Sequence, residues 1–171
     1  SGAGQPVLNL HIKTFHSMVM EFIHDEISRD KIRQQNPIES LVLLSRIWEE
    51  QHTPSGYLLS LQPSQALFQK LLVSFSQIRL AGLHGSDLAE DHFESPDKGK
   101  ELFFLLQEYL AALKGHSRID YAEALHIAIR KADQGTLPLP ANAVILLPDD
   151  LRLKGLEQQF LERIRKQTIS L

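Results

Sequence analysis

One stretch towards the C-terminal end of the chain, Ala143–Ile164, constrains the fold more than any other. It opens with four apolar residues, Val144–Leu147, between Pro140 and Pro148, a pattern typical of a short buried strand. Apolar residues then recur three and four positions apart, which predicts an amphipathic helix with one buried face. These helix positions are Leu153, Leu156, Phe160 and Ile164. A strand that is apolar throughout needs neighbours on both sides, so we looked for further strands in the chain.

A second strand is predicted at Val7–Lys13, where apolar and polar residues alternate. The remainder favours helices, because start signals recur along the chain. They are Thr14, Asn36-Pro37 with Glu39, Pro63, Ser95-Pro96, and Asp120 with Glu123. Gly82 and Gly115 are placed to end two of these helices, and residues 25–33 are interpreted as a charged, exposed connection. The predicted fold is mainly α, with about six helices and two short strands.

Composition limits what this chain does. Its 171 residues suffice for one domain with a real core, and 43% hydrophobic with 23% charged residues is ordinary for a soluble protein. A net charge of −3 argues against a free-standing DNA-binding module. The absence of cysteine and of any long apolar run favours a cytoplasmic protein with no membrane partner. We interpret residues 1–5 as a tag remnant and 6–171 as one domain.

Two clusters of side chains are candidate sites by residue type alone. A polar loop contains four potential metal ligands, but metal sites usually draw ligands from several elements, so we predict no metal and no cofactor. These residues are His84, Asp87, Asp91 and His92. Basic residues near the predicted helix at 121–132 are suited either to phosphate contacts or to a solvated helix surface. They are Arg130 and Lys131, with Lys114, His116 and Arg118.

Three segments in the same order resemble the UvrD/Rep superfamily 1 helicases. Lys13–Ser17 (KTFHS) resembles their TFHS motif, and Asp120-Tyr121 resembles a conserved helix start. The stretch VILLPDDLRLKGLEQQFL at residues 144–161 is similar to their Walker B region. The resemblance implies a helical 1B subdomain inserted into a RecA-like domain. The strands at 7–13 and 143–147 would then be parallel edge pieces of that domain.

The Walker B region is degenerate in this chain. The family's strand ends in Asp-Glu, whose carboxylates hold magnesium and activate water, but these positions fall on Pro148 and Asp149. Proline can neither bind a cation nor polarise water. No GxxxxGK(S/T) phosphate loop occurs in the chain. Asp149 and Asp150 therefore have two interpretations, as magnesium ligands or as caps of the following helix.

These departures resemble the AddB-like, inactivated helicase subunits of bacterial helicase–nuclease complexes. The resemblance implies a piece of a longer DNA repair or recombination protein that scaffolds and guides DNA beside a partner helicase–nuclease subunit. It also implies DNA contacts by Thr14, Phe15 and His16; the alternative is that Thr14 caps a helix and His16 is merely partly exposed. Arg130 and Lys131, from the basic cluster, are further candidate DNA contacts. A different class, a helical protein-interaction domain with no DNA role, stays open. Pro148 argues against an active ATPase.

The segment PDDLRLK at residues 148–154 also superficially resembles the PD…(D/E)xK nuclease signature. In those nucleases the acidic residues lie on separate strands and meet across a metal ion. Asp149, Asp150 and Lys154 instead fall within one turn and helix start, so we do not expect nuclease activity.

Overall fold

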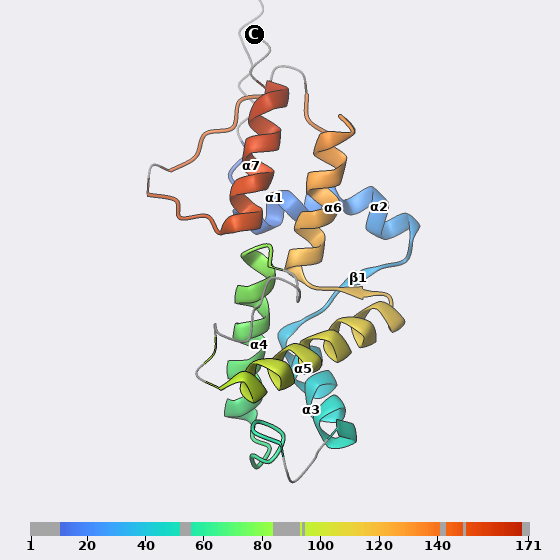
Figure 1. Cartoon of the computed structure of the whole chain (residues 1–171). Helices are drawn as coiled ribbons and strands as arrows, with labels where there is room; N and C mark the ends of the chain where they lie inside the picture. The colour runs from blue at the N-terminus through green and yellow to red at the C-terminus, as the bar shows by residue number, and fades with distance from the viewer. Residues whose placement is uncertain are drawn as a thin grey trace, which may run out of the picture.

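The computed structural model describes residues 11–51, 56–83, 93, 95–140, 143–148 and 150–168, with only the backbone of 166–168. Within these residues the chain is mainly helical, with seven helices and two short strands (Figure 1). The helices are α1 Phe15–Phe22, α2 His24–Arg29, α3 Pro37–Gln51, α4 Gln65–Leu80, α5 Pro96–Gly115, α6 Tyr121–Asp133 and α7 Gly155–Thr168. The strands are β1 Arg33–Gln34 and β2 Arg118–Ile119. The predicted class, mainly α with two short parallel strands, is confirmed.

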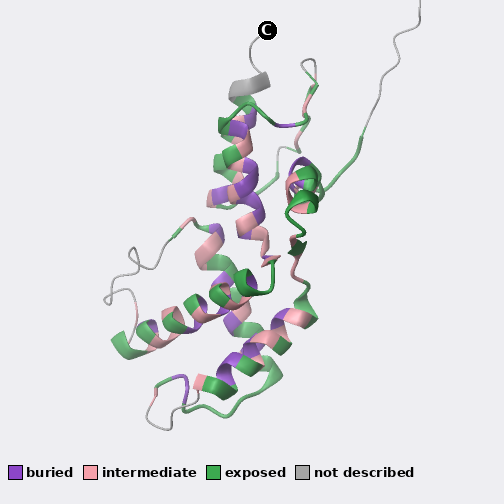
Figure 2. Ribbon diagram, turned by 90° about the vertical axis from the view of Figure 1, so that its right-hand side faces the viewer, coloured by how far each residue is buried: buried purple, intermediate pink, exposed green. Residues whose placement is uncertain are grey.

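The helices pack around two separate hydrophobic cores. We call α1, α2, α6 and α7 the terminal lobe, because its core joins the two ends of the chain, from Val19 to Ile164. We call α3, α4 and α5 the middle lobe, whose core runs from Leu44 to Leu113. Figure 1 shows the terminal lobe above the middle lobe, and Figure 2 shows buried positions on the helices of both.

The two strands join the lobes. β1 leads from α2 into α3, and β2 leads from α5 into α6, with Arg33 opposite Arg118 and Gln34 opposite Ile119 in a parallel pair. The chain therefore leaves the terminal lobe and returns to it at the same place. A second link is Arg79 at the end of α4, whose guanidinium donates to both carboxylate oxygens of Asp120 at 2.8 and 3.0 Å.

Most predicted helix starts are confirmed by their cap bonds. Asn36 Oδ1 accepts from the Glu39 amide at 2.9 Å, and Asp120 Oδ1 accepts from the Glu123 amide at 2.8 Å. Ser64, next to the predicted Pro63, caps α4 in the same way. Gly82 ends α4 with a φ of +75°, a backbone conformation that glycine adopts without steric cost.

The predicted strand at 143–147 is wrong. These residues have no strand pairing, and the side chains of Val144 and Leu146 are 79% and 81% exposed. Ile145 alone among the large residues of this run packs against the terminal-lobe core. Of the predicted strand at 7–13, residues 11–13 have no regular structure and the earlier ones lie outside the described residues. An apolar run predicts an extended backbone, but a strand also needs a partner.

Two further expectations need correction. The segment 25–33 is mostly exposed, as predicted, but it is more than a connection, because most of α2 and the start of β1 lie in it. Asp150 does not cap α7, which begins at Gly155 after an exposed turn, and Asp149 lies outside the described residues. The start is set by packing, since a Cβ atom at Gly155 would lie 2.9 Å from the Ala81 carbonyl oxygen. Only glycine permits this approach of α7 to the end of α4.

Candidate nucleic-acid interface

The three segments that resemble helicases meet at one place in the terminal lobe, which we call the motif junction. The Phe15 ring, in the first turn of α1, lies edge-on against Phe160 of α7 with centroids 6.0 Å apart. The neighbouring His16 ring lies 4.6 Å from the ring of Tyr121, which begins α6. Tyr121 in turn donates from its hydroxyl to Glu157 of α7 at 3.1 Å. Segments more than a hundred residues apart in sequence thus form a single cluster.

His16 is the exposed member of the motif junction and is held on two sides. Its ring is tilted by 41° against Tyr121, and its Nε2 atom lies 2.7 Å from the amide nitrogen of Gln34 in β1. This hydrogen bond between the two side chains fixes the orientation of the His16 ring. An aromatic side chain that is oriented in advance and open to solvent is suited to stack against an unpaired base.

Thr14 and Phe15 hold α1 in position. Thr14 Oγ1 accepts from the Ser17 amide at 3.1 Å and lies 2.7 Å from the Ser17 hydroxyl, so it caps the helix as predicted. It stays exposed next to His16. Phe15 is half-buried against the terminal-lobe core, where it anchors α1. His16 and Thr14 are therefore the residues of this motif that are open to a ligand.

The His16 ring contacts Tyr121, and Tyr121 is in turn bound by Glu157. Burial raises the pKa of the Tyr121 hydroxyl well above its usual value, and the nearby negative charge of Glu157 raises it further. Tyr121 therefore keeps its proton, and its hydroxyl donates a hydrogen bond to Glu157. The other Glu157 oxygen accepts from the Lys154 amide at 2.9 Å, which fixes the start of α7. Sequence analysis placed Tyr121 at a helix start and gave no signal for Gln34 or Glu157.

The other predicted DNA contacts lie away from the motif junction. Arg130 is nine residues beyond Tyr121 on α6, about 14 Å along the helix axis. Its guanidinium donates to Glu26 of α2 at 3.0 Å, so its charge is balanced within the protein. Lys131 is half-buried, and its carbonyl oxygen accepts from the Thr136 hydroxyl. The structure does not bring these two residues together with His16.

The degenerate Walker B region is also separate. Pro148 and Asp150 are both exposed, and the Pro148 carbonyl accepts from the Leu151 amide at 3.1 Å in a turn. Within the described residues no group of three or more histidines and carboxylates is placed to hold a metal ion. The four potential metal ligands of the polar loop, for which no metal site was predicted, lie outside the described residues; they are His84, Asp87, Asp91 and His92.

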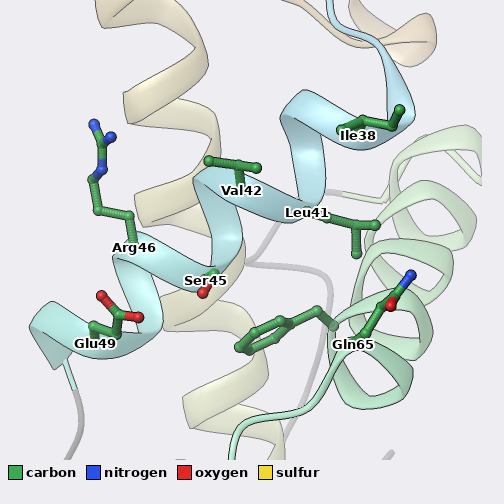
Figure 3. Close-up of a pocket in the computed structure, with 8 residues that line it drawn as sticks. Ile38, Leu41, Val42, Ser45, Arg46, Glu49 and Gln65 are labelled. Atoms are coloured by element: carbon green, nitrogen blue, oxygen red, sulfur yellow. The ribbon is translucent and has the colours of Figure 1, made fainter.

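An apolar groove on the middle lobe was not predicted. It has a volume of about 600 Å³ between α3 and α4, and the side chains around it are drawn in Figure 3. Ile38 and Val42, one turn apart on α3, are 75% and 58% exposed there. The sequence signals at the start of α3 gave no reason to expect an exposed apolar face on this helix.

Comparisons with known proteins do not assign the chain to a family. No family model, curated protein or solved structure matches the chain. No helix within the described part of the chain is long and apolar enough to span a membrane.

Proposed function

We propose that this chain is a non-catalytic, helicase-like region of a bacterial DNA repair or recombination protein. It scaffolds and guides DNA in the cytoplasm, beside a partner helicase–nuclease subunit. The observation that supports this proposal is the motif junction. The three segments that carry the helicase resemblance lie together, and they leave His16 exposed while Gln34 and Tyr121 hold it.

The chemistry of the junction favours single-stranded DNA. Histidine is one of the side chains on which unpaired bases stack, and such stacking tolerates any base. Thr14, two residues before His16, is also exposed, and its hydroxyl is able to donate to a phosphate oxygen. Pro148 stands where the resemblance would place the magnesium-binding aspartate, so we assign no ATP hydrolysis to this region.

The test is fluorescence anisotropy of labelled single-stranded and forked DNA with the chain across a salt series. We expect binding that weakens as salt rises, because phosphate contacts release counterions. Replacing His16 with alanine should weaken binding to single-stranded DNA by about fivefold to fiftyfold, the loss of one stacked base. His24→Ala is the matched control, since His24 is equally exposed but lies on α2.

Two outcomes would contradict the DNA role. One is the absence of binding at low salt by protein that circular dichroism shows to be folded. The other is equal weakening of DNA binding by His16→Ala and His24→Ala, which would show that binding does not depend on the motif junction. Either result would favour the second candidate function, a helical protein-interaction domain, for which the exposed apolar groove with Ile38 and Val42 is the supporting observation.

A further inference from the structure

A second cavity, of about 630 Å³, lies where the two lobes meet, away from His16. Its size falls in the range of small-molecule sites. The residues around it come from α2, the end of α4, α5, β2 and α6. Much of its wall is aliphatic, formed by Ile27, Ile32, Leu110, Leu113, Ile119 and Ile127. Such a wall favours the apolar body of a ligand, and charged residues decide which polar groups that ligand carries.

The carboxylates around the cavity are already paired with arginines. Asp120 and Glu123 both accept from Arg79, whose side chain is only 14% exposed. Glu26 accepts from Arg130 through Oε1. Glu123 is bonded only through Oε2, so it and Glu26 each keep one oxygen with no hydrogen bond from the described residues. These oxygens can accept from the N–H groups of a ligand.

The donors that are not used lie together at one end of the cavity. Lys114, Ser117 and Arg118 follow one another from the end of α5 into β2, and all three line the cavity. Lys114 has no carboxylate partner within the described part of the chain, and Arg118 donates only one hydrogen bond from its guanidinium, to Glu39 at 3.3 Å. Ser117 has a φ of +52°, which marks the sharp turn between α5 and β2.

We propose that this cavity binds a phosphate monoester carried by a planar ring that bears N–H donors. Lys114, Ser117 and Arg118 would contact the phosphate, the aliphatic wall would cover the ring, and Glu26 and Glu123 would accept from its N–H groups. This combination is the chemistry of a 5′-mononucleotide. An aliphatic acid would satisfy the basic end but would offer no N–H donor to the remaining oxygens of Glu26 and Glu123.

Two sources share this chemistry: a free mononucleotide and the 5′-phosphorylated end of a DNA strand. The second source rests on the proposed DNA function, and the first does not. Three members of the basic cluster seen in the sequence, Lys114, Arg118 and Arg130, thus lie at one cavity. Lys131 and His116 do not line it.

The experiment uses isothermal titration calorimetry with adenosine 5′-monophosphate as the probe and adenosine as the reference. We expect the nucleotide to bind, and adenosine to bind at least tenfold more weakly. The double variant Lys114→Gln/Arg118→Gln should weaken nucleotide binding at least tenfold. Lys131→Gln, which removes a charge outside the cavity, is the matched control and should leave binding unchanged. Lys114→Gln alone, an exposed position, should give an intermediate loss without any effect on folding.

A DNA arm separates the two sources and the two proposals. Preference for 5′-phosphorylated over 5′-hydroxyl strands, lost in the double variant, would assign the strand end as the ligand. Nucleotide binding without that preference would assign the free nucleotide. Failure of the nucleotide to bind, or equal binding by the double variant, would overturn the cavity proposal. His16-dependent strand binding would still stand in that case, because it is measured with unphosphorylated strands.

Discussion

The two lobes differ in how the chain builds them. The middle lobe is formed by one continuous part of the sequence, and its core runs from Leu44 to Leu113. The terminal lobe needs both ends of the chain, because its core joins Val19 of α1 to Ile164 of α7. Contacts across such sequence distances cost more chain entropy to form than local ones. We infer that the middle lobe can stay folded when the terminal lobe is destabilised.

The lobes also differ in where their polar contacts lie. The middle lobe has a polar pair inside its core, where the Tyr109 hydroxyl donates to Ser40 Oγ at 3.0 Å. In the terminal lobe the network of His16, Gln34 and Tyr121 reaches the surface. Buried polar pairs specify packing, whereas exposed, oriented groups are available to ligands. The comparison therefore places the exposed, oriented histidine in the terminal lobe, whereas the cavity where the lobes meet draws ligand contacts from both lobes, including Lys114 of α5.

The largest expected effect comes from Phe160→Ala in the terminal lobe. Phe160 is fully buried between Phe15 and Phe22, so its removal should cost about 3–5 kcal/mol. Trp48 is the only tryptophan in the chain and lies in the middle-lobe core, so its fluorescence reports that lobe alone. In urea, the circular dichroism midpoint of the variant should fall well below its Trp48 fluorescence midpoint.

Phe104→Ala is the control for Phe160→Ala. Phe104 is 41% exposed on α5, so its loss should shift neither midpoint by much. Coincident circular dichroism and fluorescence transitions in Phe160→Ala would show that the two lobes unfold as one unit. That result would contradict the inference that the middle lobe stays folded when the terminal lobe is destabilised.

A smaller effect is expected from Glu101→Gln in the middle lobe. The Glu101 carboxylate accepts from the Tyr57, Leu58 and Leu59 amides at 2.6, 2.7 and 3.0 Å. Burial opposes ionisation here, but the three N–H groups outweigh it and hold the pKa of Glu101 below its usual value. Each such bond to a carboxylate is worth about 1.5–3 kcal/mol at most, and solvent exposure reduces this, so we expect a total loss of about 1–2 kcal/mol.

The pH dependence of this effect has a definite sign. A carboxyl group with a lowered folded-state pKa stabilises the protein above its unfolded pKa, near 4.3, and loses that contribution as pH falls through the folded value. Urea midpoints of Trp48 fluorescence for wild type and Glu101→Gln should therefore differ at pH 7 and converge in acid. Glu108→Gln on the same helix should track wild type. A constant difference across the pH range would mean that the charge of Glu101 is not involved.

The sequence predicted the local features of both lobes. Cap residues such as Asn36 and Asp120 act within one helical turn, so their neighbours in sequence decide the outcome. Leu156, Phe160 and Ile164 were predicted on a buried helix face, and they are at most 2% exposed. The short strands were missed, because Arg33 and Arg118 carry no apolar pattern and pair only where the chain enters and leaves the middle lobe.

The candidate site was predictable only in part. His16 stood out through its motif, and its exposure follows from the first turn of a capped helix. Its partners Gln34 and Tyr121 come from other elements, and no local pattern links residues that meet through the tertiary fold. The cavity between the lobes depends in the same way on five elements coming together.

The smallest expected effect comes from the double variant Val144→Thr/Leu146→Thr. Both side chains are about four-fifths exposed, so threonine should change the free energy of unfolding by no more than about 0.5 kcal/mol. Ile145→Ala, between them, should cost about 1 kcal/mol or more, because Ile145 packs against the terminal-lobe core. Urea denaturation followed by circular dichroism measures both values.

The relative size of these two free-energy changes tests whether residues 143–147 are covered on one face or on both. Alternating exposure along an extended backbone, with one side on the core, requires Ile145 to matter more than its neighbours. A cost above about 1.5 kcal/mol for Val144→Thr/Leu146→Thr would mean that both faces are covered in solution. Since strands apolar on both faces are buried inside sheets, that outcome would restore the strand that the sequence predicts and require a partner strand for it.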